Sequence, residues 1–475
     1  MKRQSVRIDG EAVTTDAWME VRAPYDGALI AEVPRCDAQH VDRAVAAARR
    51  VMLDEPLAAW RRAEILDRAA EVLSTDEVHE DLARTIAMES AKPLTTARGE
   101  VDRAVSTLRF SVAECRRLVG EMLPLDASQA GEGRLGFSLR VPVGVIGAIT
   151  PFNFPLNLVV HKIGPAIAAG CAVVLKPAHQ TPLSGLKLAE LLHDRCGLPP
   201  AWLSTVTGAG SEVGAALVDH DDVAMITFTG SPEVGWGIRA SAPRKRVSLE
   251  LGNNAPVIVQ PDAELDLAAN KIAAAGFTHA GQSCISVQRV LVHESVASDL
   301  TDRLARAVEA LVVGDPMDPA TQVSSVIDVD NRKRIEGWID EAAADGATVT
   351  CGGKVNTDGV LLPTVLTDVD LDAKVCREEI FGPVVTVNSY ATIDEAFAIA
   401  NDTKYGLHAG IFTTDLDIAR RAISTLDFGG VIVNDVPTWR ADQMPYGGLR
   451  DSGNTREGPA YAVQEMTELR SVVLS

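Results

Sequence analysis

From Val141 onward, short β-branched runs bounded by glycine or proline alternate with helical stretches. The runs are VGVIGAIT, CAVVLKP, WLSTVTG, AMITFTG, RVSLELG and APVIVQ. Such alternation predicts a parallel sheet covered by helices, and near-continuous apolar strands are typical of burial on both faces. Since a second strand–helix series follows, we expect an α/β fold of two lobes joined near residue 250, preceded by a largely helical first third.

The size and charge of the chain exclude several classes of protein. Its 475 residues can bury more than one core. A balance of 45 basic against 65 acidic residues opposes binding to nucleic-acid phosphates. No apolar run reaches the ~18–20 residues of a membrane span, and the start, MKRQSVRIDGEAV, lacks the apolar stretch of a signal peptide. We therefore expect a cytoplasmic protein whose partners include neither nucleic acid nor membrane.

The seven cysteines form no CxxC pair and do not cluster with histidine, so neither a disulfide framework nor a metal site is predicted. Cys284 differs from the others in its context. It lies in HAGQSCISVQRV, where a helical pattern ends at a glycine-rich break and a strand begins. A thiol there can be presented at a cleft, although a lone loop cysteine is more often inert. A nucleophilic role also needs local help, since a free thiol has a pKa near ~8.5.

Two glycine-rich turns join strands to helices. GAGSEVG begins at Gly208, and FTGSPEVG contains Gly230 and Ser231, which lies at or beside a helix N-cap. Each is open to reading as an ordinary capped turn. Two in consecutive strand–helix units favour a dinucleotide, because phosphate approaches helix amides at such turns.

Two further polar residues follow strands. Glu250 ends a β-branched run, where partial burial suits a general base, and a solvated charge is the alternative. Asn153 lies between Pro151 and Pro155, where a fixed side-chain amide can donate to an oxyanion or can simply cap a turn.

Together these segments resemble the ordered motifs of the NAD(P)-dependent aldehyde dehydrogenase superfamily. The motifs are TPFNFP (150–155), LKPAHQTP (175–182), FTGSPEVG (228–235), LELGNNAP (249–256), GQSC (281–284), EEIFGPV (378–384), NDTKYGLHAGIFT (401–413) and PYGGLRDSGNTREG (445–458). The resemblance implies a Rossmann-like cofactor domain, an α/β catalytic domain and a small β oligomerisation segment. These would span residues 1–118 with 142–251, residues 252–442, and residues 119–141 with the tail 443–475, respectively.

The resemblance also implies how the site residues act. Cys284 would be the nucleophile, the amide of Asn153 and the Cys284 N–H would hold the oxyanion, and Glu250 would activate water for thioester hydrolysis. Lys162 and Glu457 match residues that relay protons.

The resemblance places the cofactor, NAD or NADP, among a further set of residues. Lys176 would contact the adenosine ribose, Ser231 would lie at the pyrophosphate turn, and Glu379 would bind the nicotinamide ribose beside Phe381. His179 occupies the place where NAD-preferring members often have glutamate. An imidazole would not repel a 2′-phosphate, so the preference between NAD and NADP stays open.

For the substrate, the segments GQSCISVQR and VNDVPTWRADQMPYGG resemble a bacterial branch of lactaldehyde-type enzymes. A small aliphatic or hydroxylated aldehyde, oxidised to its acid, is therefore expected, with Phe154 and Arg440 beside it. Arg440 could bind a carboxylate or hydroxyl of the substrate, or could instead pair with an acid at the surface. In phosphonoacetaldehyde dehydrogenases a corresponding arginine helps hold the phosphonate. Their arginine before the nucleophile is Ser283 here, and their histidine after the oxyanion asparagine is Phe154, so a dedicated phosphonate site looks incomplete.

Two alternatives to this reading are a CoA-acylating dehydrogenase and a non-catalytic protein that keeps the fold. The acid at position 250 disfavours the first, and the full set of reactive residues disfavours the second. Residues 119–141 and the last fifteen alternate polar and apolar residues, as exposed strands do. They could pair on a partner subunit, as the resemblance implies for a homodimer or homotetramer, or form a hairpin on the same chain.

Overall fold

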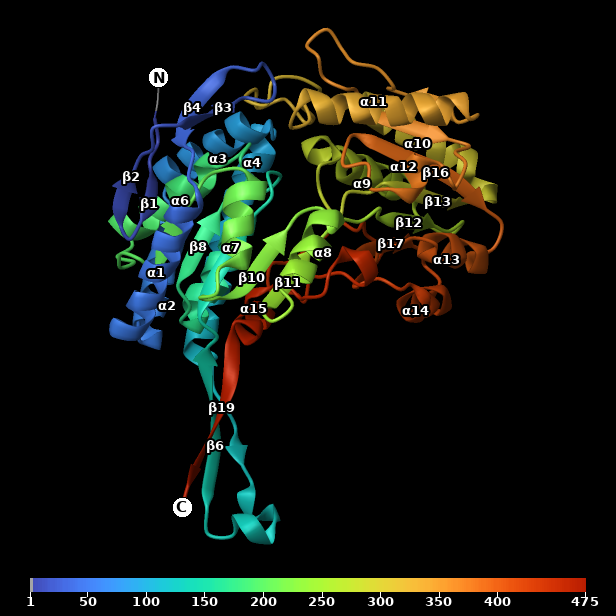
Figure 1. The fold of residues 1–475 in the computed structure, drawn as a ribbon. Coiled ribbons are helices and arrows are strands. Elements are labelled where there is room, and N and C mark those ends of the chain that lie inside the picture. The colour runs from blue at the N-terminus through green and yellow to red at the C-terminus, as the bar shows by residue number, and fades with distance from the viewer. Residues whose placement is uncertain (1–2) are drawn as a thin grey trace.

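Two parallel sheets organise residues 3–475, the part of the chain that this computed structural model describes (Figure 1). The first sheet has the order β11-β10-β7-β8-β9 and is parallel throughout. Its strands are β7 (Val145–Ile149), β8 (Val173–Lys176), β9 (Leu203–Thr205), β10 (Val223–Thr229) and β11 (Arg246–Glu250). The chain leaves β7 toward β8 and β9 and then returns to β10 on the opposite side, so a crevice opens beyond the ends of β7 and β10.

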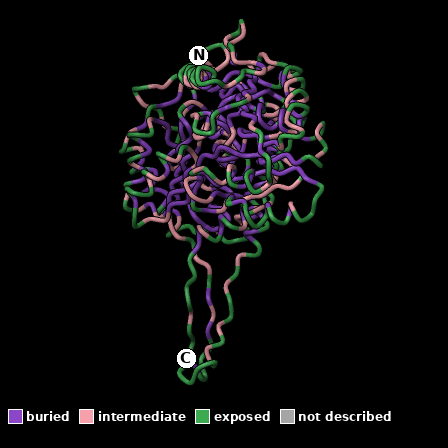
Figure 2. Tube along the Cα trace, turned by 90° about the vertical axis from the view of Figure 1, so that its right-hand side faces the viewer, coloured by how far each residue is buried: buried purple, intermediate pink, exposed green. Residues whose placement is uncertain are grey.

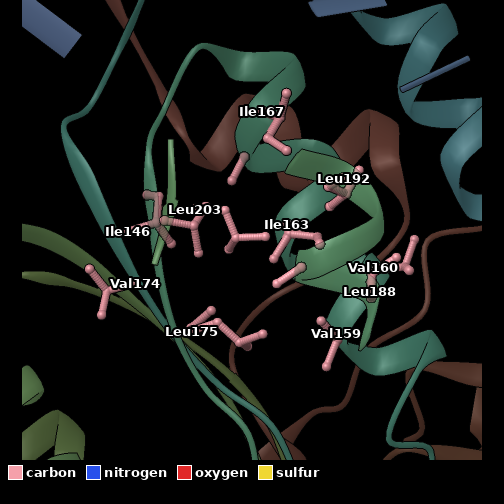
Figure 3. Packing of buried hydrophobic residues seen from close by; sticks show 14 of the residues in the cluster. Ile146, Val159, Val160, Ile163, Ile167, Val174, Leu175, Leu188, Leu192 and Leu203 are labelled. Carbon is pink, nitrogen blue, oxygen red and sulfur yellow. The ribbon is translucent and has the colours of Figure 1, made fainter. Parts of the chain in front are cut away.

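The strands of the first sheet are apolar along their length because helices cover both faces. Every residue of β7, β8 and β9 is buried. Figure 3 shows the strand residues Ile146 and Leu203 on the side of Ile163 of helix α5 (Asn157–Ala169), and Leu188 of helix α6 (Leu183–Asp194) belongs to the same cluster. The remaining helices between these strands are α7 (Ala215–Asp219) and α8 (Pro232–Ser241).

The second sheet has the order β14-β15-β16-β13-β12-β17-β18. All its pairs are parallel except β14 with β15. Its strands are β12 (Pro256–Val259), β13 (Arg289–His293), β14 (Thr348–Cys351), β15 (Thr364–Thr367), β16 (Val384–Tyr390), β17 (His408–Phe412) and β18 (Gly430–Val433). The intervening helices are α9 (Leu265–Phe277), α10 (Ala297–Glu309), α11 (Val329–Ala344), α12 (Lys374–Arg377), α13 (Ile393–Asn401) and α14 (Leu416–Thr425). The predicted α/β fold with two parallel sheets is confirmed.

The first third is largely helical, as predicted, and four short strands precede its helices. The strands are β1 (Val6–Ile8), β2 (Glu11–Val13), β3 (Trp18–Arg22) and β4 (Leu29–Pro34). The helices are α1 (Ala38–Asp54), α2 (Ala59–Leu73), α3 (Asp76–Ser90) and α4 (Leu94–Arg117). Their buried residues belong to the same hydrophobic core as the first sheet, so this segment stabilises the lobe of β7–β11. Within residues 3–475, no helix is both long and apolar enough to cross a bilayer.

An antiparallel sheet projects from the body as an arm (Figures 1 and 2). It consists of β5 (Met122–Leu123), β6 (Leu135–Pro142) and β19 (Thr467–Leu474), in the order β19-β6-β5. Helix α15 (Pro459–Glu465) precedes β19. The two stretches predicted to be exposed strands therefore pair with one another within the chain, and Figure 2 shows that most of the arm is exposed.

Candidate active site

A cavity of about 990 Å³ lies between the two lobes. The first sheet contributes the carboxyl ends of β7, β8, β10 and β11, whereas the second lobe contributes loops that precede β13 and β16. Most of the residues predicted for the site line this cavity, namely Asn153, Phe154, Lys176, His179, Gly230, Ser231, Glu250, Cys284, Glu379, Phe381, Arg440 and Glu457. Lys162 and Gly208 are absent from its lining. Residues separated by 300 positions in the sequence thus meet at one place.

Cys284 faces this cavity and is not packed into a core. It follows a sharp turn in which His279, Ala280 and Gly281 all have positive φ. A Cβ on Gly281 would lie 2.1 Å from the Gly382 carbonyl oxygen, so only glycine fits there. Cys284 is half-buried, whereas the other six cysteines are buried. Burial raises the pKa of the Cys284 thiol to about 12, and a hydrogen bond with Tyr446 opposes that rise.

Two hydrogen-bond donors lie beside the thiol. The Nδ2 of Asn153 donates to the carbonyl of Gln282, two residues before Cys284, at 2.9 Å. This bond fixes the side-chain amide of Asn153 and leaves its second Nδ2 hydrogen available. Within residues 3–475, the backbone N–H of Cys284 has no hydrogen-bond partner. The turn that carries Asn153 is held from behind, because the Glu100 carboxylate accepts from the N–H groups of Leu156 and Asn157. These two donors can bind the oxyanion that develops on a carbonyl oxygen when the Cys284 sulfur adds to the carbonyl carbon.

Glu250 ends β11, is 5% exposed, and neither of its carboxylate oxygens has a hydrogen-bond partner among the described residues. Burial and the neighbouring Glu457 raise the pKa of Glu250 well above its ordinary value, while Arg440 and Lys162 oppose that rise. A buried carboxylate with free lone pairs and a raised pKa has the properties of a general base.

Lys162 and Glu457 lie beside Glu250 in a buried group of charges. Lys162 donates to Thr227 at 3.2 Å and to Thr229 at 2.8 Å. Glu457 accepts from Nη2 of Arg440 at 2.7 Å. Although burial favours the neutral acid, the nearby His161, Arg440 and Lys162 hold the pKa of Glu457 below its ordinary value. Glu457 is therefore an ionised neighbour of Glu250.

The other half of the cavity has the donors and acceptors that a dinucleotide needs. One side of α8 lines the cavity from Gly230 at its N-terminus to Ser241. Ser231 caps this helix, since its hydroxyl accepts from the Val234 N–H. Burial lowers the pKa of Lys176 to about 8, and its ammonium has only the Pro177 carbonyl as hydrogen-bond partner among the described residues. A helix N-terminus and a lysine without a counter-ion fit the phosphates and ribose of NAD or NADP.

The carboxylate predicted for the nicotinamide ribose is held in place by a tight contact. Glu379 accepts from the Asn253 N–H at 3.0 Å, and a Cβ on Gly252 would lie 2.3 Å from its Oε2. Burial raises the pKa of Glu379 to about 7. Phe381 lies beside it with φ of 52° and contacts the edge of Phe152 at 5.7 Å between ring centroids.

In the first glycine-rich turn, the glycine predicted to bind the cofactor, Gly208, is not the one that lines the cavity. Gly210 and Gly214 line the cavity, whereas Gly208 does not. A Cβ on Gly208 would lie 2.4 Å from Val213 Cγ2, so this glycine permits packing beneath the turn. The same turn continues into a π-helical segment, Gly210–Gly214, before α7.

Sequence reasoning missed three residues that shape the site. Tyr446 and Arg103 line the cavity, and the Asp442 carboxylate pairs with Arg103 at 2.8 Å. Tyr446 lies inside the quoted PYGG motif, and Asp442 follows Arg440 by two residues, so both had a local signal. Arg103 lies within helix α4, and no motif around it in the sequence indicated a role in the site.

The fold and the cavity define a dinucleotide-dependent oxidoreductase. The chain belongs to the aldehyde dehydrogenase family, whose model matches residues 12–472. It is therefore an NAD(P)-dependent enzyme that oxidises an aldehyde to the carboxylic acid, as the ordered motifs predicted.

Several known proteins are similar along their whole length. The 3-sulfolactaldehyde dehydrogenase of Priestia megaterium is 46% identical over 476 residues, covering 100% of this chain and 98% of the relative. The lactaldehyde dehydrogenase of Methanocaldococcus jannaschii is 37% identical, with 98% and 99% covered. Aldehyde dehydrogenase 21 from Physcomitrella patens, solved with the reaction product succinate, superposes with a TM-score of 0.95 at 38% identity, with 100% and 98% covered.

Proposed function

We propose that the protein oxidises a small hydroxylated aldehyde that carries an anionic group. The observation that carries this proposal is that Arg103 and Arg440 line the same cavity as Cys284, in addition to Arg334, which donates to the Ile380 carbonyl. Arginine is suited to carboxylate and sulfonate oxygens because it presents several donors in a fixed plane. The relatives named for 3-sulfolactaldehyde and solved with succinate act on acidic compounds, which supports the same class of substrate.

Both arginines are held by carboxylates that leave other donors free. Arg440 is 5% exposed and pairs with Glu457, while its buried Nε has no partner among the described residues. Arg103 is 33% exposed and directs Nε and Nη2 to one oxygen of Asp442. The two carboxylates neutralise the pair of arginines, so recognition would depend on oriented N–H groups near the substrate and less on net charge.

In the proposed mechanism, the Cys284 thiolate attacks the aldehyde carbon and the carbonyl electron pair moves to oxygen. Asn153 Nδ2 and the Cys284 N–H donate to that oxygen as its charge develops. The bound nicotinamide supplies the hydride acceptor of the family reaction. Loss of a hydride from the carbon of the adduct leaves the acyl group on Cys284 as a thioester. Glu250 then removes a proton from the attacking water, the C–S bond breaks, and Cys284 leaves as the thiolate while the acid is released. Lys162 and the ionised Glu457 lie where they influence the charge of Glu250.

Arg103→Gln tests the substrate class. The amide keeps a hydrogen-bond donor toward Asp442 but removes the other guanidinium N–H groups from the cavity. For 3-sulfolactaldehyde, kcat/KM is expected to fall about 10- to 100-fold, the worth of a hydrogen bond to a charged group. For lactaldehyde, which lacks the sulfonate, kcat/KM is expected to change little. Steady-state kinetics on both aldehydes measure the difference.

Arg98→Gln is the matched control, because Arg98 lies on the same helix but pairs with Glu80 outside the cavity. It should leave both aldehydes unaffected. Equal losses for lactaldehyde and sulfolactaldehyde in Arg103→Gln would contradict the proposed anionic group.

His179→Glu tests the adenosine end of the cofactor site. His179 lines the cavity beside Lys176, and burial together with Lys176 lowers the pKa of its imidazole, so the side chain is neutral at pH 7. A carboxylate there would accept from ribose hydroxyls and repel a 2′-phosphate. We expect kcat/KM for NADP to fall by about 10-fold or more relative to NAD. His179→Gln should leave the ratio near its original value, and an unchanged ratio in His179→Glu would remove residue 179 from cofactor selection.

We infer that the domains divide as the sequence predicted and that the arm assembles a homodimer or homotetramer. The strand pair β6–β19 extends from the body and exposes several apolar side chains, namely Leu135, Leu139, Leu469, Val473 and Leu474. Their burial against a second copy would explain them better than solvent exposure. The seven unpaired cysteines support a reducing, cytoplasmic compartment.

A further inference from the structure

Tyr446 presents a hydroxyl to the sulfur of Cys284. Its Oη lies 2.8 Å from Cys284 Sγ and has no other hydrogen-bond partner within residues 3–475. The residue is 2% exposed, and its backbone exchanges two hydrogen bonds with Glu457. The Arg440 guanidinium lies 3.8 Å from its ring centroid, and His408 contacts the ring at 5.0 Å. The hydroxyl is therefore held in place from the backbone and from two neighbouring side chains.

We propose that Tyr446 is a further catalytic residue, which donates a hydrogen bond to the Cys284 thiolate and so increases the fraction of ionised sulfur. In the thiol form, either the sulfur or the phenol can be the donor. In the thiolate form, only the phenol carries a proton. A hydrogen bond to an ion is stronger than one between neutral groups, so the contact favours the ionised sulfur.

The groups around the Cys284 sulfur disfavour its ionisation, so a hydrogen-bond donor is needed to stabilise the thiolate. Burial raises the pKa of the thiol, and the negative charges of Glu379 and Glu250 add to the rise, whereas Tyr446 and Arg440 oppose it. Burial and the adjacent sulfur raise the pKa of the phenol well above 10, so Tyr446 stays protonated at pH 7 and acts as a donor, not a base. Arg440, which lies over the ring face, opposes this rise in the pKa of the phenol and so makes the hydroxyl a stronger donor.

The role in the reaction follows from this bond. As the thiolate attacks, the S–C bond forms, the carbonyl π pair moves to oxygen, and the sulfur loses its charge. Tyr446 keeps its proton throughout, and its hydrogen bond weakens as the charge moves to the oxyanion. The donor therefore increases the amount of thiolate while it slightly lowers the reactivity of each thiolate.

Tyr446→Phe tests the inference, which rests on the proposal that Cys284 is the nucleophile. The change keeps the ring between Arg440 and His408 and removes only the hydroxyl. Alkylation of Cys284 by iodoacetamide is measured from pH 5 to 10 by peptide mass spectrometry on the cofactor-free protein. Because the thiol pKa lies above this range, the alkylation rate should rise with pH in both proteins. We expect the curve of rate against pH for the variant to lie about 1 to 2 pH units higher, so that its rate at pH 7 falls about 10- to 100-fold.

Tyr390→Phe is the control for loss of a buried tyrosine hydroxyl. The Tyr390 hydroxyl donates to the Val259 carbonyl in the second lobe, outside the cavity. It should leave the curve of alkylation rate against pH unchanged. An unchanged curve in Tyr446→Phe, or a lower rate that no longer rises with pH, would overturn the inference. Because alkylation needs neither aldehyde nor cofactor, a shifted curve in a protein whose Cys284→Ala form stayed active would instead refute the proposed nucleophile.

Discussion

Cys284→Ala is expected to lower the rate of aldehyde-dependent cofactor reduction by at least about 10,000-fold. In the proposed mechanism, Asn153, the Cys284 N–H and Glu250 assist the reaction, but only the thiol forms the covalent bond that retains the acyl group. The measurement is the absorbance of the reduced nicotinamide at saturating aldehyde. Binding of the cofactor itself should persist, because the residues that line its half of the cavity are untouched.

Cys351→Ala is a matched control, since Cys351 is buried at the edge of the second sheet, outside the cavity. It should retain nearly full activity. If Cys284→Ala were as active as Cys351→Ala, the covalent mechanism would be wrong, and the cavity would have to transfer hydride without a thioester.

The strands of this fold could be predicted from the sequence because strands that are buried on both faces consist of nearly continuous apolar residues. The runs around Ile146, Val174 and Ile258 all became buried strands. Glycine and proline mark the ends of these runs, so the alternation with helices could also be read. The two lobes then follow from where the series restarts after Glu250.

The site was predictable only where chemistry and a local turn coincide. Cys284 stands out because it follows Gly281, whose left-handed conformation is needed to turn the chain into the cavity. The contact between Tyr446 and Cys284 joins residues 162 positions apart, and such a contact leaves no periodic trace in the sequence. Arg103 was hidden for another reason, because an arginine on an amphipathic helix usually faces solvent.

The charge state of Glu250 could not be predicted from the sequence either, because it depends on charged residues that are distant along the chain. Sequence can place an acid at the end of β11, but it cannot show that Glu457, Arg440 and Lys162 surround it. Burial, together with these three groups, decides how strongly Glu250 holds its proton. The electrostatic state of the base is therefore a property of the assembled fold, and it has a measurable consequence.

Glu250→Gln is expected to lower steady-state turnover about 100- to 10,000-fold, the usual contribution of a general base. The first turnover should survive, because attack by Cys284 and cofactor reduction precede hydrolysis of the thioester. A rapid burst of reduced nicotinamide, stoichiometric with enzyme, should therefore precede a slow phase. Stopped-flow absorbance resolves the two phases. Glu378→Gln, which alters an acid that pairs with Lys404 outside the cavity, should show neither change.

The pH profile of the slow step gives a second reading of the same residue. Burial and Glu457 raise the pKa of Glu250 above its ordinary value, and only the ionised form can accept a proton from water. Hydrolysis in the parent should therefore increase as pH rises through that elevated pKa, and this limb should be absent from Glu250→Gln. A variant that kept both the limb and full turnover would show that another group activates water. If added CoA abolished the slow phase and an acyl-CoA accumulated, the acyl acceptor would be CoA, and Glu250 would have to be reassigned from base to structural acid.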